Sequence, residues 1–132
     1  MRIGILTFHY ACNYGAMLQT YATQEFLRSM GHDVCVVDYR NKSVEEGYAA
    51  WNFKIDLLKT LPRAFSRAMR NSRFRHFMKE CLVLSKDPFD SFDVLLFGSD
   101  QIWNELITGG FDKTYWGELT TKARNVAWAA SA

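Results

Sequence analysis

The stretch RIGILTFHYACNYGAMLQTYATQEFLRSMGHDVCVVDY, residues 2–39, decides the fold class of this chain. Its first seven residues are apolar, β-branched or aromatic after Arg2 and predict a buried strand. Four apolar residues then recur every four positions and predict the buried face of a helix: Leu18, Ala22, Phe26 and Met30. Gly31 is predicted to end this helix. A second apolar run, residues 34–39, predicts another strand, so the stretch reads as a βαβ unit with parallel strands.

Two more apolar runs, residues 92–97 and 126–130, predict a third and a fourth strand. Between strands two and three, residues 43–85 predict a helical insertion in which Pro62 breaks the helix and Asn71 with Ser72 caps a second piece. We therefore predict an α/β fold: one Rossmann-like domain over residues 1–132, with a doubly wound parallel sheet in the strand order two, one, three, four.

Composition narrows the class of protein. With 132 residues, of which 48% are hydrophobic and 23% charged, the chain fits one globular domain. Three cysteines without a C-x-x-C pair argue against a disulfide framework and favour a reduced, cytoplasmic protein. No apolar run approaches the roughly 18 residues needed to span a bilayer, and no spacing of His, Cys and carboxylates predicts a metal site.

In a doubly wound sheet, ligands bind at the carboxyl ends of the strands beside the switch point, here between strands one and three. The first candidate ligand-binding loop is residues 9–15. His9 at a strand end can act as an acid or a base, and the helix start at Asn13 and Gly15 offers backbone N–H groups to an anion. The plainer alternative is that Asn13 only caps the helix. The glycine fingerprints of dinucleotide and P-loop sites are absent.

The second loop, residues 98–104, is denser in chemistry. Trp103 offers an indole face for a sugar, while the neighbouring side chains supply a hydroxyl, a carboxylate and two carboxamides. The alternative is a helix cap with a buried tryptophan. The candidate residues are Gly98, Ser99, Asp100, Gln101, Trp103 and Asn104.

A positive segment runs from Lys54 to Lys79, with eight basic residues and one acidic residue. Four of its side chains align on one helical face: Lys59, Arg63, Arg67 and Arg70. Such a face suits an anionic membrane surface or an acidic glycan, although a solvated helix face is the commoner meaning of a charge run. No nucleic-acid reading motif accompanies it, so nucleic acid is not an expected partner.

Taken in order, five segments resemble the amino-terminal half of the polysaccharide pyruvyl transferase family: IGILTFHYACNYGAMLQTYA, GHDVCVVDYR, FDVLLFGSDQIWN, ITGGFD and NVAWAASA. The match is weakest in the insertion, residues 41–85. The combination of NYGA after the first strand with GSDQIWN after a later one is what makes the resemblance specific.

The resemblance implies a two-lobed fold similar to GT-B glycosyltransferases, of which this chain is the first lobe and a missing carboxyl-terminal lobe the second. It implies transfer of pyruvyl from phosphoenolpyruvate, with no other cofactor, to a glycan or lipid-linked sugar in exopolysaccharide or cell-surface glycan biosynthesis. The basic face described above would place this cytoplasmic protein at the inner face of the membrane. The chain alone is then expected to be inactive. His9 and Asp100 are the expected catalytic residues; the family-like substrate contacts are Asn13, Gly15, Gln19, Gly98, Ser99, Gln101, Trp103 and Asn104.

Two other functions stay open at this stage. One is a glycosyltransferase-like lobe that binds a nucleotide sugar. The other is a non-catalytic domain that uses its basic helix against a membrane or a partner protein.

Overall fold

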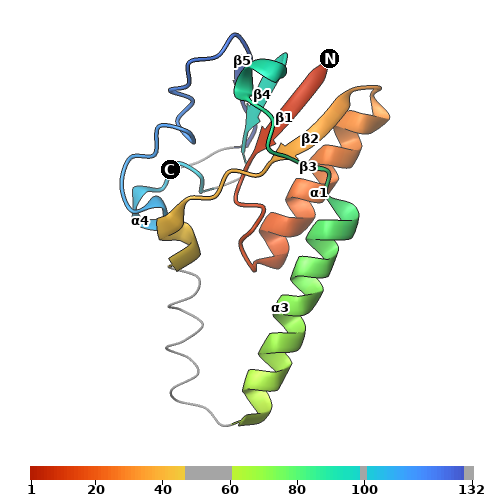
Figure 1. Cartoon of the computed structure of the whole chain (residues 1–132), viewed down its shortest axis with the longest axis vertical. Coiled ribbons are helices and arrows are strands. Elements are labelled where there is room, and N and C mark those ends of the chain that lie inside the picture. Colours follow the sequence, from red (N-terminus) through yellow and green to blue (C-terminus); the bar gives the residue numbers. More distant parts are fainter. Residues whose placement is uncertain (47–60, 99–100, 130–132) are drawn as a thin grey trace.

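The computed structural model describes residues 1–46, 61–98 and 101–129 and contains one parallel five-stranded sheet in the order β3-β2-β1-β4-β5 (Figure 1). The strands are β1 (Arg2–Leu6), β2 (Asp33–Val37), β3 (Leu84–Ser85), β4 (Val94–Phe97) and β5 (Arg124–Ala127). The α/β Rossmann-like class and the order of the four predicted strands are confirmed. The edge strand β3 was not predicted, because a two-residue strand carries no hydrophobic period.

Helix α1 (Tyr14–Ser29) starts and ends as predicted. Asn13 is its N-cap, and Gly31 follows it with φ 83°, in the left-handed region that favours glycine. The predicted buried face was wrong, however, because Leu18, Ala22, Phe26 and Met30 are all exposed. The fully buried residues of α1 are Met17, Thr20 and Gln24.

Hydrogen bonds explain how polar groups come to occupy that buried face. The Thr20 hydroxyl donates to the Ala16 carbonyl at 2.7 Å. The Gln24 amide donates to the Cys81 carbonyl at 3.0 Å and accepts from the Val83 N–H at 2.8 Å. Since buried polar groups are tolerated when they are paired, these contacts override the apolar pattern.

In the insertion, residues 42–46 are helical and the long helix α3 spans Leu61–Cys81. Pro62 lies in the first turn of α3, where its missing N–H breaks no intrahelical bond, and the residues before Leu61, where the predicted break would lie, are outside the described part of the chain. The predicted cap at Asn71 and Ser72 was wrong, since α3 runs through both. The insertion has apolar residues at helical spacing, of which Met69 is exposed. The others lie outside the described side chains: Trp51, Ile55, Leu58, Leu61 and Phe65.

The sheet has a different cover on each face. Helices α1 and α3 lie side by side on one face (Figure 1), where Ile3, Ile5, Val34, Val36 and Leu96 pack with Leu82. On the other face, Leu6, Val37, Leu95 and Phe97 pack against a chain segment that follows β4 and includes α4 (Glu105–Thr108). Ile102 and Tyr115 from that segment are fully buried there. None of the described helices is long and apolar enough to cross a membrane.

Candidate functional site

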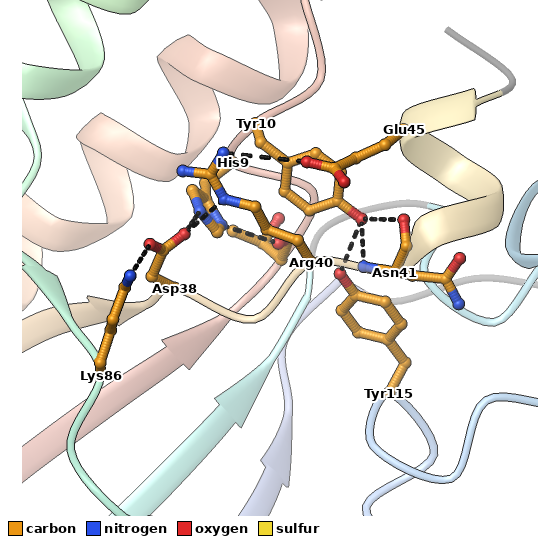
Figure 2. Close-up of polar contacts among 9 residues, drawn as sticks. His9, Tyr10, Asp38, Arg40, Asn41, Glu45, Lys86 and Tyr115 are labelled. Carbon is orange, nitrogen blue, oxygen red and sulfur yellow. Dashed lines mark hydrogen bonds and ion pairs between the residues drawn. The ribbon is translucent and has the colours of Figure 1, made fainter. Parts of the chain in front are cut away.

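The richest polar cluster lies where β1 and β2 end (Figure 2). Residues 7–13 follow β1 and residues 38–41 follow β2, and the two strands are parallel neighbours. Parallel pairing therefore brings both sets of side chains to one edge of the sheet, the edge at which open α/β sheets bind ligands.

Asp38 is the centre of this cluster. Its side chain is 10% exposed and has three basic neighbours: Arg40 Nε at 2.7 Å and His9 Nε2 at 3.0 Å from Oδ1, and Lys86 Nζ at 3.9 Å from Oδ2. Burial alone raises the pKa of Asp38, but the hydrogen bonds from Arg40 and His9 outweigh it and hold the pKa below its ordinary value. Asp38 is therefore a carboxylate at neutral pH.

His9 lies behind Asp38 and is completely buried. Burial lowers the pKa of His9, against the opposing effect of its hydrogen bond to Asp38, so the imidazole is neutral at pH 7. Because a carboxylate only accepts, Nε2–H donates to Asp38, while Nδ1 lies 3.3 Å from the Thr7 carbonyl oxygen. In this structure His9 orients Asp38 and does not face solvent.

Arg40 projects from this pair toward a cavity. Asp38 fixes its Nε, Glu45 Oε1 lies 3.8 Å from its Nη1, and its guanidinium carbon lies 6.0 Å from the centre of the Tyr10 ring. These three contacts hold the guanidinium over the phenol ring (Figure 2). The cavity measures about 520 Å³, and Arg40, Tyr10 and Glu45 line it from one side.

Helix α3 lines the other side of this cavity with Asn71, Phe74 and Arg75. Two guanidinium groups, a carboxylate, a carboxamide and two aromatic rings thus surround one space. Its volume falls in the range of about 300–1,000 Å³ that is usual for small-molecule sites. The arrangement can bind an anion and hydrogen-bond a polar ligand.

A tyrosine network supports the wall of the cavity. The Tyr10 hydroxyl accepts from the Asn41 N–H at 2.9 Å and lies 3.4 Å from the Tyr115 hydroxyl. Burial strongly raises the pKa of Tyr115, which therefore stays a neutral phenol. Asp112, also buried, accepts from the Tyr39 hydroxyl at 3.0 Å and from Asn41 Nδ2 at 2.6 Å. These bonds tie the segment after β4 to the end of β2.

The predicted residues of the first loop form the helix start. Asn13 Oδ1 accepts from the Gly15 N–H at 2.8 Å and from the Ala16 N–H at 3.4 Å, so the side-chain oxygen takes the N–H groups that an anion would use. Gln19 lies a turn further on, beside Thr7 and Gly98, in a crevice too small for more than about one water molecule.

Gly98 is required by packing. A Cβ atom there would lie 1.9 Å from the carbonyl oxygen of Trp128, so no other residue fits without moving the chain after β5. Ser99 and Asp100, the next two predicted residues, lie outside the described residues. Their geometry relative to His9 is therefore not part of the site described above.

The other predicted residues of the second loop mainly stabilise the fold. Gln101 is exposed, and Asn104 caps α4 by accepting from the Leu106 N–H at 3.0 Å. The Trp103 indole N–H donates to the Tyr115 carbonyl at 2.8 Å, and its ring stacks on Trp116 with 5.5 Å between the ring centres. Trp116 and Phe111 carry the more exposed rings of this aromatic group, at 42% and 50%.

The structure adds functional candidates that the sequence prediction missed: Tyr10, Asp38, Arg40, Glu45, Asn71 and Arg75. A usable signal existed for Asp38 and Arg40, since polar residues directly after a buried strand had marked both predicted loops. Arg75 had no such signal, because it is one base in a basic helix. Among the described residues, no group of three or more His, Cys, Asp or Glu side chains could hold a metal ion.

Comparison with known proteins gives one match. No curated protein and no solved structure matches the chain. A family model described as polysaccharide pyruvyl transferase matches residues 13–132, nearly the whole chain. That range covers α1, every strand after β1 and the α3 wall of the cavity. With its Rossmann-like sheet and its cavity at the carboxyl ends of β1 and β2, the chain belongs to the polysaccharide pyruvyl transferase family.

Proposed function

We propose that this chain is the amino-terminal lobe of an enzyme that transfers a pyruvyl group from phosphoenolpyruvate to sugar hydroxyls of a glycan or lipid-linked sugar. The observation that carries the proposal is the family match over residues 13–132. The cavity supports it, because it lies at the ligand-binding edge of the sheet and is lined by cationic and hydrogen-bonding groups. The product would serve exopolysaccharide or cell-surface glycan synthesis.

The reaction sets clear demands on the site. Two sugar hydroxyl oxygens bond to the central carbon of the enol, the methylene carbon gains a proton, and the carbon–oxygen bond to phosphate breaks. A base must take the hydroxyl protons, an acid must supply the carbon proton, and cations must stabilise the leaving phosphate. Asp100 stays the proposed base, and the buried His9 acts through Asp38, to which it is hydrogen-bonded.

The proposed acceptor contact is the aromatic group after β4. Trp103 is anchored by its hydrogen bond to Tyr115, and Trp116 and Phe111 extend its surface toward solvent. The apolar face of a pyranose ring packs well on such rings. We propose that the acceptor glycan lies across them, with Gln101 and Asn104 near its hydroxyls.

The proposed membrane contact uses the positive face of α3. Arg70 is exposed, as a lipid headgroup contact requires; Lys59 lies outside the described residues, as do the side chains of Arg63 and Arg67. Binding to vesicles that contain anionic lipid, and its loss at high salt, would support a location at the inner face of the membrane. Equal binding to neutral vesicles would remove the charge argument.

The decisive experiment measures phosphate release from phosphoenolpyruvate by a protein that joins this chain to a carboxyl-terminal lobe. Acceptor-dependent release is expected, together with a ketal-linked pyruvate on the product by mass spectrometry. Asp100→Asn should slow turnover by at least about 100-fold if Asp100 is the base. Release of a nucleotide from a nucleotide sugar instead would replace the proposal with a glycosyltransferase, and no turnover of either donor would favour a binding domain.

A further inference from the structure

The cavity between α3 and the carboxyl ends of β1 and β2 is lined by charged, polar and aromatic side chains, which restrict the class of ligand that can bind there. We infer that it binds an anionic sugar, in which a carboxylate or phosphate lies between Arg40 and Arg75 and a hydroxyl donates to Asn71. The inference rests on the proposed function in taking this sugar to be the charged unit of the acceptor glycan, whose neighbouring unit packs on the rings of Trp103, Trp116 and Phe111. The cavity volume of about 520 Å³ accommodates a monosaccharide with a charged substituent.

The charges around the cavity favour an anion. Arg40 is fixed through Nε by Asp38, which leaves its terminal nitrogens as donors. Arg75 is exposed on α3, and among the described residues no carboxylate pairs with it. Glu45 is the opposing charge, but its oxygen lies 3.8 Å from Arg40, a weak contact on an exposed side chain. A ligand carboxylate or phosphate can replace it with shorter, bidentate contacts.

The Asn71 side chain favours a sugar over a simple anion as the ligand. Its side-chain oxygen is buried, and no donor in the described part of the chain reaches it. A buried acceptor without a donor is costly, so the Asn71 side chain gains by turning its oxygen into the cavity, where a ligand hydroxyl can donate to it. Phosphoenolpyruvate has no hydroxyl group to donate, whereas a sugar has several. The rings of Tyr10 and Phe74 in the same lining offer apolar surface to the sugar ring.

The test is isothermal titration calorimetry of the chain with glucuronate, glucose 1-phosphate, glucose and phosphoenolpyruvate at pH 7 and low salt. At least one of the two charged sugars should bind at least about tenfold more tightly than glucose, since charge-assisted hydrogen bonds are the strong ones. Arg75→Gln should weaken that binding by about tenfold or more, and Glu45→Gln should strengthen it. Arg73→Gln, a change on the same helix outside the cavity, is the matched control and should leave it unchanged.

Opposite signs for Arg75→Gln and Glu45→Gln separate ligand binding from loss of folding, which would weaken binding in both variants. The inference is overturned if glucose binds as tightly as the charged sugars, if Arg75→Gln and Arg73→Gln act alike, or if only phosphoenolpyruvate binds in the cavity. Phosphate release with neutral acceptors alone also overturns it and leaves the proposed function standing. Arg75-dependent binding of a charged sugar without any pyruvyl transfer supports the inference and removes the proposed function.

Discussion

Asp112→Asn tests how the wall of the cavity is held. Asp112 is 8% exposed, and four donors point at its carboxylate: the Tyr39 hydroxyl at 3.0 Å, Asn41 Nδ2 at 2.6 Å, and the N–H groups of Thr114 and Tyr115 at 2.9 and 3.3 Å. An asparagine keeps the shape of the side chain but offers a single acceptor oxygen and a new N–H₂ donor. At least one of these donors must therefore lose its acceptor.

The magnitude follows from which donors are lost. If the new oxygen faces the backbone N–H groups, the new N–H₂ faces Asn41 Nδ2, which cannot turn over because Asn41 Oδ1 already accepts from the Val44 N–H at 3.1 Å. An unpaired buried donor costs about 1–3 kcal/mol, and the remaining bonds lose their charge assistance. We expect the free energy of unfolding to fall by about 3 kcal/mol, a large share of the roughly 5–15 kcal/mol of a typical domain.

The assay is urea unfolding followed by tryptophan fluorescence, since Trp103 and Trp116 lie in the affected segment. The midpoint should fall with an unchanged slope. Asp90→Asn is the matched control: Asp90 is exposed, its carboxylate accepts from the Lys122 N–H at 3.0 Å, and we expect a loss below about 1 kcal/mol. Equal losses in the two variants would refute the reasoning.

Three further outcomes follow from single contacts. Gly98→Ala should lower the melting temperature and weaken the pairing of β5, because its Cβ would lie 1.9 Å from the Trp128 carbonyl; an unchanged melting temperature would contradict this. Gln24→Leu should cost about 2–4 kcal/mol by stranding the Val83 N–H and the Cys81 carbonyl, and Gln19→Leu, at a half-buried position, should cost far less in the same urea titration. The pKa values of His9 and Asp38 both lie below their ordinary values, so the unfolded chain binds more protons than the folded chain. The free energy of unfolding should therefore fall as the pH drops below about 6.5. A urea midpoint that stays constant or rises from about pH 7 to about pH 5 would exclude this pH dependence.

The strands and the helix start were predictable because each rests on a local signal. Residues 2–8 and 92–97 are apolar runs that only a buried strand explains, and Asn13 stands directly before the helix it caps. The buried face of α1 was not predictable from its period. Gln24 is buried because the Cys81 carbonyl and the Val83 N–H lie opposite it, and those partners are more than fifty residues away in the chain.

The candidate site was likewise predictable only in part. The predicted loop after β1 lies at the same edge of the sheet as the cavity, since strand direction alone determines that edge. The prediction could not find Arg75, because which of the many bases of α3 faces the cavity depends on how α3 packs on α1. The rings of Tyr14 and Phe74, with 4.6 Å between their centres, make one contact of that packing.

The segments that carry the family resemblance supply residues that stabilise the fold and also half of the cavity lining: Tyr10, Ala11, Cys12, Met17 and Arg40. Asn13 and Asn104 cap helices, Asp112 ties a loop to β2, and Gly98 admits the chain after β5. These are tasks that any member with this fold must perform, whatever its substrate. The other half of the lining comes from the insertion, where the resemblance is weakest: Glu45, Asn71, Phe74, Arg75 and Met78. If the sugar binds in this cavity, exchanging residues 41–83 between family members should therefore change acceptor preference while leaving all five strands in place.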